Sequence, residues 1–124
     1  MTRNEGAING LAGALRFGAW GCVLAIAILS LLPAEEMVRT SLGGHIEHAV
    51  AYAGTASIMA LAYANRRLSS VAAALIVYAG VLEFLQRFSP GRHSSVDDFL
   101  ASSVGVLIGI AAVISVRAVR RVRV

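Results

Sequence analysis

The sequence contains no lysine, and charged residues of every kind make up only 15% of its 124 positions. Soluble domains usually carry about a quarter charged residues. Hydrophobic residues make up 57% of the chain. This apolar density excludes a disordered chain, because such a sequence collapses instead of staying solvated. It also argues against an ordinary soluble domain.

Cysteine and proline are scarce too, with one and two residues respectively. The single cysteine, Cys22, excludes an internal disulfide and the zinc and redox motifs that need several cysteines. It lies within an apolar run, where a small packing role is expected. Pro33 lies at the end of the first apolar run, and Pro90 lies beyond the third. No cofactor and no metal ion is expected from these residue types.

The hydrophobic residues are concentrated in four runs with few or no charges, at 17–34, 49–65, 68–82 and 99–116. A helix that crosses a bilayer needs about 17–25 such residues, a length the third run reaches if it continues to about residue 86. We therefore predict an all-α polytopic membrane protein, a bundle of four transmembrane helices forming one domain over residues 1–124. The helices are expected at about 11–33, 45–64, 68–88 and 95–117, after a frayed polar tail.

Local signals support these boundaries. Pro33 ends the first helix, because proline cannot continue the backbone hydrogen bonds. Glycines at 43–44 and the Ser-Pro-Gly sequence at 89–91 mark turns. The segment 94–98 is typical of a helix start, with serine caps followed by two acidic residues in the first turn. The first helix also has features of a signal peptide, but its long apolar core favours an uncleaved span.

The arginines indicate an orientation. With four spans, one side of the membrane holds eight of them: Arg3, Arg16, Arg66, Arg67, Arg117, Arg120, Arg121 and Arg123. The other side holds only Arg39, Arg87 and Arg92. Cytoplasmic loops carry the excess of basic residues, so both termini are expected in the cytoplasm of a bacterium, with the chain in its inner membrane. The net charge of +4 reflects this pattern, and nucleic acid is not an expected partner, because no basic stripe with interleaved aromatics occurs.

The opposite side collects the other ionisable groups. It receives six of the seven acidic residues and all three histidines, namely Glu35, Glu36, Glu47, Glu83, Asp97, Asp98, His45, His48 and His93. Charged groups near the ends of membrane helices turn toward the bundle interior or a wet cavity. We therefore expect a polar pocket at this outer end, between the second, third and fourth helices.

Helical spacing indicates which residues belong to that pocket, because positions three and four apart share a helix face. The candidate ligand-binding residues are His48, Tyr52, Glu83, Gln86, Arg87, Arg92, Ser95, Asp97, Asp98 and Ser102. Below the acidic pair, Ala101, Gly105 and Gly109 form a small-residue stripe that lets two helices approach closely. Structural explanations stay open: the two aspartates can cap the last helix, and Glu83 with Arg87 can be an ordinary ion pair.

The second half of the chain carries a recognisable order of motifs. They are His48-x-x-x-Tyr52, Glu83-x-x-Gln86, Ser89-Pro90-Gly91-Arg92, Ser95, Asp97-Asp98 and Gly105-x-x-x-Gly109. This order resembles the signature of the VanZ-like family, small bacterial membrane proteins named for a teicoplanin-resistance protein, over about residues 45–109. Gly44-His45 stands where members often have Asp-Lys, and Ser102 where they usually have Asn. The resemblance implies a role in the cell envelope that alters the action of a glycopeptide antibiotic.

Three functions are compatible with these residues. In the first, the pocket binds the polar headgroup of a membrane lipid or a lipid-linked cell-wall precursor, with arginine holding an anionic group. In the second, the protein is an intramembrane enzyme: Glu83 or Asp98 is a general base, or His48 and the carboxylates hold a divalent metal. In the third, the polar cluster closes one end of a bundle that binds a partner protein or a second copy of itself.

Overall fold

The computed structural model describes residues 3–122, and all regular structure in that range is helical. The elements are α1 (Arg3–Leu31), the short 3₁₀ helix η1 (Ala34–Glu36), α2 (Gly44–Ala62), α3 (Leu68–Leu85), the 3₁₀ helix η2 (Gln86–Phe88) and α4 (Val96–Val122). The expected all-helical class with four helices is confirmed.

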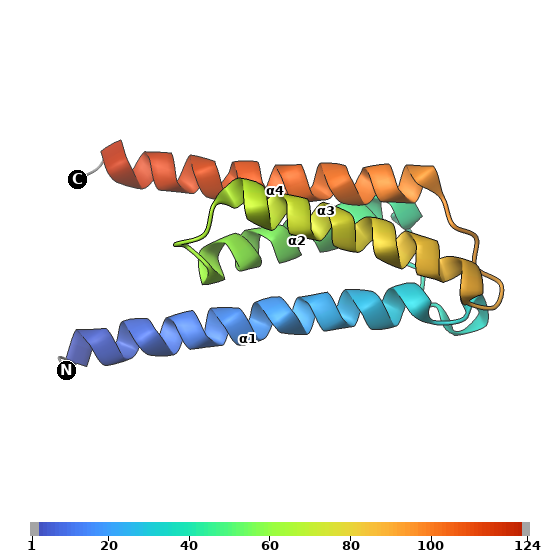
Figure 1. Cartoon of the computed structure of the whole chain (residues 1–124), viewed down its shortest axis with the longest axis horizontal. Coiled ribbons are helices and arrows are strands. Elements are labelled where there is room, and N and C mark those ends of the chain that lie inside the picture. The colour runs from blue at the N-terminus through green and yellow to red at the C-terminus, as the bar shows by residue number, and fades with distance from the viewer. Residues whose placement is uncertain (1–2, 123–124) are drawn as a thin grey trace.

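Consecutive helices run in opposite directions, so both ends of the described chain lie at the same end of the bundle (Figure 1). We call this the terminal end; the turn 63–67 between α2 and α3 faces it. The loops 32–43 and 86–95 lie at the opposite end, which we call the loop end. Each helix packs against its neighbour in the sequence, and α2 packs most extensively against α4.

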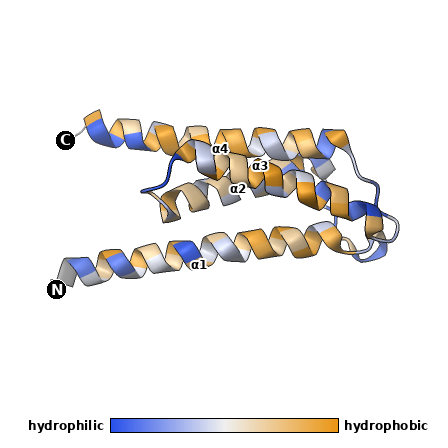
Figure 2. Ribbon diagram, in the orientation of Figure 1, coloured by the Kyte–Doolittle hydropathy of each residue, from blue (hydrophilic) through white to orange (hydrophobic). Residues whose placement is uncertain are grey.

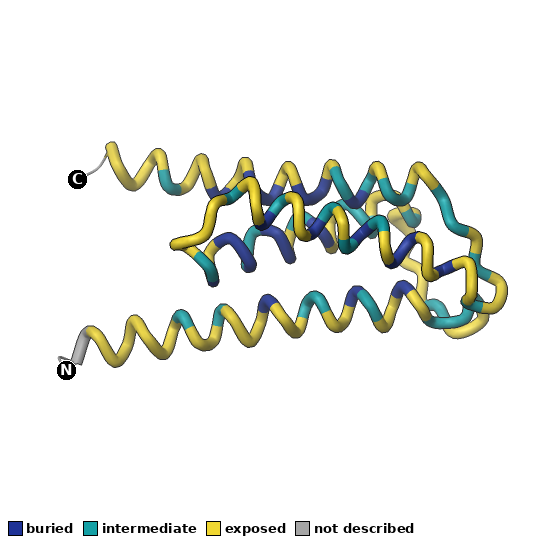
Figure 3. The backbone as a smooth tube through the Cα atoms, viewed as in Figure 1, coloured by how far each residue is buried: buried dark blue, intermediate teal, exposed yellow. Residues whose placement is uncertain are grey.

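Three of the helical segments are long and apolar enough to cross a membrane, at Glu5–Leu31, Leu68–Phe88 and Val96–Val122. Hydrophobic residues dominate their middle parts, and hydrophilic residues gather at the two ends of the bundle (Figure 2). The fourth helix, α2, is 19 residues long but is richer in small and polar residues. It lies among the other three and carries much of the buried surface (Figure 3). A helix that is shielded by its neighbours needs less apolar surface of its own.

Some helix boundaries differ from those expected. Helix α1 begins at Arg3 instead of near residue 11, and α4 continues to Val122 instead of about residue 117. No proline interrupts either extension, and single glycines reduce helix stability without ending a helix. Helix α3 ends at Leu85, because its last expected turn tightens into η2.

Helices α2 and α4 form the tightest contact of the bundle, and two glycines make it possible. A methyl group on Gly105 would lie 2.2 Å from the carbonyl oxygen of Ala49, and one on Gly109 would lie 2.3 Å from that of Ala53. The two backbones are therefore in direct contact, as a small-residue face allows. The hydroxyl of Ser57 donates to the carbonyl of Ala53 in its own helix at 2.9 Å and lies 3.3 Å from the carbonyl of Gly109 across this contact.

The loops at the loop end are bound to one another. The backbone N–H of Ala34 donates to the carbonyl of Pro90 at 3.1 Å, and the hydroxyl of Ser89 donates to the carbonyl of Leu31 at 3.0 Å. Gly91 has φ +72, and a methyl group there would lie 3.0 Å from the side chain of Ala34. Only glycine fits this close left-handed position without strain. The end of α1 is thus attached to the loop between α3 and α4.

Candidate functional site

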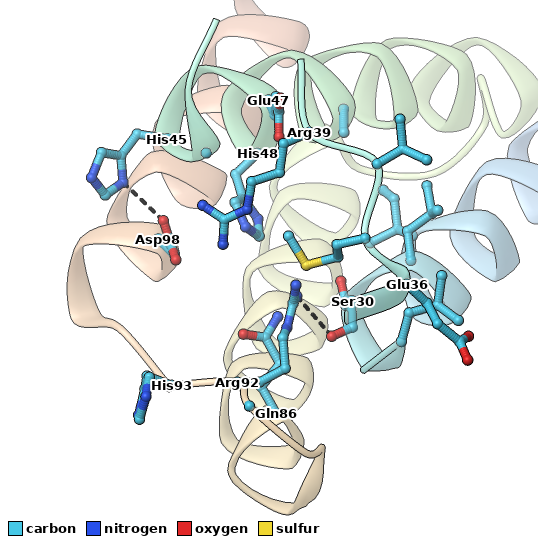
Figure 4. A pocket seen from close by; sticks show the side chains of 18 of the residues that line it. Ser30, Glu36, Arg39, His45, Glu47, His48, Gln86, Arg92, His93 and Asp98 are labelled. Atoms are coloured by element: carbon cyan, nitrogen blue, oxygen red, sulfur yellow. Dashed lines mark hydrogen bonds and ion pairs between the residues drawn. The ribbon is translucent and has the colours of Figure 1, made fainter. Parts of the chain in front are cut away.

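The loop end contains an open pocket of about 450 Å³ (Figure 4). Its walls come from the last turns of α1, the segment 36–39, the first turns of α2, and the loop between α3 and α4. Asp98 of α4 and Gln86, the residue that follows α3, also line it. All four helices, or the residues directly beyond their ends, therefore contribute to the pocket.

Arg92 forms one side of this pocket. It follows the left-handed Gly91, and its guanidinium donates a hydrogen bond to the carbonyl of Ser30 at 2.9 Å. That carbonyl belongs to the last turn of α1, where four carbonyls have no partner within the helix. The pKa of Arg92 is lowered, first by burial and then by the nearby charge of Arg39. The carboxylates of Glu83 and Asp98 oppose this change. Arg92 remains charged and has further N–H groups to donate.

Arg39 is the second arginine of the pocket, and it reaches in from the loop before α2 (Figure 4). The next residue, Thr40, is held by Glu47 in the first turn of α2. The backbone N–H and the hydroxyl of Thr40 both donate to the same carboxylate oxygen of Glu47, at 2.6 and 2.5 Å. This double hydrogen bond fixes the loop at the position where Arg39 projects.

Neither arginine of the pocket is neutralised by a carboxylate in direct contact. At the pocket, His45 Nδ1 lies 2.8 Å from Asp98 Oδ1, a contact that is an ion pair when His45 is protonated. Neither Arg39 nor Arg92 lies within 4.0 Å of a carboxylate oxygen in residues 3–122. Three carboxylates line the same pocket: Asp98 is engaged by His45, Glu47 is engaged by Thr40, and Glu36 is exposed. The pocket can therefore bind a negatively charged group with two guanidinium forks.

Polar and apolar surfaces meet in the pocket. His48 lines it, with its Nδ1 atom 3.4 Å from the buried hydroxyl of Ser102. The buried side chains of Tyr52 and Gln86 also line it. The apolar part of the lining includes Ile26, Leu29, Leu32, Met37, Val38 and Ala51. This lining suits an amphipathic ligand.

Glu83 lies behind the pocket and is 7% exposed. Its Oε1 atom accepts a hydrogen bond of 2.5 Å from the backbone N–H of Ser95, the residue before α4. The hydroxyl of Ser95 in turn accepts from the backbone N–H of Asp98 at 3.4 Å, the helix cap that the sequence predicts. Glu83 thus attaches the start of α4 to the end of α3.

The ten expected ligand-binding residues fall into three groups. Five line the pocket: His48, Tyr52, Gln86, Arg92 and Asp98. Three lie behind it and support it: Glu83, Ser95 and Ser102. Two do not line it: Arg87, which is exposed, and Asp97.

The position of Arg87 differs from the one expected. Its guanidinium lies over the ring of Phe84, 5.4 Å from the ring centre, and not beside Glu83. The expectation assumed a continuous α-helix, in which residues four apart share a face. Because α3 passes into η2 after Leu85, the rotation per residue increases there, and Arg87 turns away from the face of Glu83.

Several lining residues were not predicted as site residues from the sequence, above all Arg39 and His45, together with Ser30, Glu36, Glu47 and His93. Arg39 lies in an irregular loop, where no periodicity predicts the direction of a side chain. His45 has a usable signal, because it stands three residues before His48 at the start of a helix. Ser30 also has such a signal, because it is a polar residue near the end of the apolar run 17–34.

The residues proposed for a metal site do not converge. Within the described range, no three histidine, cysteine or carboxylate side chains come together as a metal ion would require. His48 contacts Ser102, Asp98 pairs with His45, and Glu83 binds the backbone of Ser95. The three candidates for acid–base or metal chemistry therefore have separate partners.

Comparison with known proteins identifies a relationship over most of the chain. A family model described as VanZ/LLP1 matches residues 25–117. The match begins in the second half of α1 and ends in α4, so it includes every wall of the pocket and exceeds the region 45–109 that the motifs suggested. No curated protein and no solved structure matches the chain.

Proposed function

We propose that this chain, which belongs to the VanZ-like family, binds an amphipathic ligand at the loop end of its bundle. The anionic headgroup of the ligand lies between Arg39 and Arg92, and its apolar part lies along the end of α1. A membrane phospholipid and a lipid-linked cell-wall precursor share this chemistry, a phosphate group attached to a long apolar chain.

One observation carries the proposal: two guanidinium groups enter the same pocket without a carboxylate at ion-pair distance in residues 3–122. Each guanidinium can give a forked pair of hydrogen bonds to phosphate or carboxylate oxygens. Asp98, Gln86 and His48 supply acceptors and donors for hydroxyl or amine groups of the same headgroup. The apolar wall formed by Ile26 and Leu29 supports an attached hydrocarbon chain.

The proposal predicts that Arg39→Ala removes one bound anionic lipid per chain. A hydrogen bond to a charged group contributes about 1.5–3 kcal/mol, so affinity should fall about tenfold or more. Native mass spectrometry of the protein in detergent measures this occupancy. Arg92→Ala should have the same effect, but it also removes the bond to Ser30, which makes Arg39→Ala the cleaner variant.

The matched control for this experiment is Arg87→Ala. Arg87 is also an exposed arginine at the loop end, but it does not line the pocket. Arg87→Ala should therefore keep the bound lipid. Equal lipid occupancy in the wild type, Arg39→Ala and Arg92→Ala would contradict the proposal.

We also propose that the chain lies in the bacterial inner membrane with four spans, and that the terminal end faces the cytoplasm. The arginine distribution supports this orientation. In a Cys22→Ser background, a cysteine introduced by His93→Cys should react with a membrane-impermeant maleimide in intact cells. One introduced by Arg67→Cys, in the exposed turn at the other end, should react only after lysis. The reverse pattern would overturn the orientation.

An outward-facing pocket also supports a role in glycopeptide susceptibility, provided that the headgroup belongs to a cell-wall precursor. Cells that express the wild-type chain should then differ in susceptibility to a glycopeptide antibiotic from cells that express Arg39→Ala. A phospholipid ligand would leave the two strains equal in this assay while mass spectrometry still detects the bound lipid.

A further inference from the structure

A second cavity, separate from the loop-end pocket, lies between α1, α2 and α3. It is an open groove of about 360 Å³ whose walls include Val23 of α1, Met59 of α2, and Val71 and Leu75 of α3. Its surface is almost entirely apolar, and Arg66 in the turn between α2 and α3 lies at its mouth. None of its residues lines the loop-end pocket.

Two hydrogen bonds connect the α1 wall of the groove to its other two walls. Near the mouth, the indole N–H of Trp20 on α1 donates to the hydroxyl of Tyr63 at the end of α2, at 2.8 Å. At the deep end, the hydroxyl of Tyr78 on α3 donates to the backbone carbonyl of Val23 on α1. Helix α1 is therefore hydrogen-bonded to the α2 wall and to the α3 wall, and the packing of the three helices forms the groove.

The length of the groove fits one leaflet of a bilayer. Along α3 it extends from Ser70 to Tyr78, which corresponds to about 12 Å at 1.5 Å per residue. The hydrocarbon core of one leaflet is about 15 Å deep. The groove thus offers an apolar surface over most of the depth that an acyl chain occupies.

The mouth of the groove has the chemistry of a lipid headgroup site. Tyr63 and Trp20 line it, and aromatic rings of this kind favour the membrane–water boundary. The guanidinium of Arg16 lies 5.4 Å from the centre of the Tyr63 ring. Arg66 adds a second positive charge at the same place. Arg16 already donates to the carbonyl of Ala62 at 3.4 Å and does not line the groove. Arg66 does line the groove and forms no ion pair within the described residues, so its guanidinium can face the phosphate of a lipid.

We infer that this groove binds one anionic phospholipid from the leaflet at the terminal end of the bundle. One acyl chain lies between α1 and α3, and the phosphate group lies at Arg66. This lipid is distinct from the ligand of the loop-end pocket, because the two sites open at opposite ends and share no residue.

Trp20 is the only tryptophan of the chain and is itself part of the groove, so its fluorescence reports on the site. The protein is reconstituted into phosphatidylcholine vesicles that contain a minor share of phosphatidylglycerol with brominated acyl chains, which quench nearby indole. Matched vesicles contain the same share of brominated phosphatidylcholine. Half-maximal quenching should require about fivefold less of the anionic lipid than of the zwitterionic one.

Two variants test the contact with the lipid headgroup and the contact with its acyl chain separately. Arg66→Gln should abolish the fivefold preference for phosphatidylglycerol while quenching by both lipids remains. Ala74→Phe places a ring in the groove from an exposed position of α3, and it should reduce quenching by both lipids. The matched controls are Arg67→Gln and Ala73→Phe, which change exposed neighbours that do not line the groove; both should behave like the wild type.

Three results would overturn the inference. If Arg66→Gln and Arg67→Gln weakened the preference equally, the selectivity would come from general surface charge. If Ala74→Phe left quenching unchanged, no acyl chain would lie in the groove. If Ala74→Phe instead converted a dimer to a monomer in detergent, a second copy of the chain would occupy the groove in place of a lipid.

Discussion

Gly105→Ala is expected to lower the free energy of unfolding of the bundle in detergent by about 3 kcal/mol or more, the upper end of what overpacking costs. The added methyl group would lie 2.2 Å from the carbonyl oxygen of Ala49. That atom belongs to the backbone of α2, so it cannot rotate away as a flexible side chain would. Helix α4 must move outward instead, and the contact between Ser102 and His48 at the pocket wall should be lost with it.

The matched control is Gly54→Ala on α2. A methyl group there meets nothing within 4 Å, and alanine stabilises a helix interior by about 0.5–1 kcal/mol relative to glycine. Gly54→Ala should therefore unfold at the same temperature as the wild type or a higher one, measured by circular dichroism during heating. Equal effects of the two substitutions would show that close α2–α4 packing does not stabilise the fold.

Glu83→Ala is expected to lower the free energy of unfolding by about 2–3 kcal/mol, because it removes a charge-assisted hydrogen bond and leaves the N–H of Ser95 without its partner. Glu83→Gln should lower the free energy of unfolding by only about 1 kcal/mol, since an amide oxygen can accept the same hydrogen bond without the charge. Thermal unfolding of the three proteins in detergent measures these differences. The order of stability should be wild type, then Glu83→Gln, then Glu83→Ala.

Asp97→Ala provides the control for this series. Asp97 is a carboxylate in the first turn of α4, and it interacts there mainly with the helix dipole, which contributes about 0.3–1 kcal/mol. Asp97→Ala should therefore lower the free energy of unfolding by less than Glu83→Ala does. If Glu83→Gln retained full stability but lost a measurable enzymatic activity, the carboxylate of Glu83 would be a general base and not a structural hydrogen-bond acceptor.

The polar residues of the loop end thus divide into two kinds. Glu83, Ser95, Ser102 and the Thr40–Glu47 pair hold helices and loops together through hydrogen bonds with named partners. Arg39 and Arg92 face the pocket with donors to spare.

The sequence by itself determined the class of protein and the end at which its polar groups gather. Its apolar runs predict four helices, since hydrocarbon excludes charged side chains and every backbone group must be bonded within the helix. The motifs from His48 to Gly109 indicated the family that the comparison confirms over residues 25–117. These features depend on local composition and order along the chain, which are visible without coordinates.

The tertiary structure alone decided which polar residues share a pocket. Arg39 lies in an irregular loop and reaches the site because Thr40 is bound by Glu47, a contact that no periodicity encodes. Arg87 leaves the site because α3 tightens into η2, and Glu83 faces Ser95 because α4 starts beside it. The direction of a side chain at a helix end depends on the geometry of the last turn and on the packing of distant segments, and both exist only in the folded bundle.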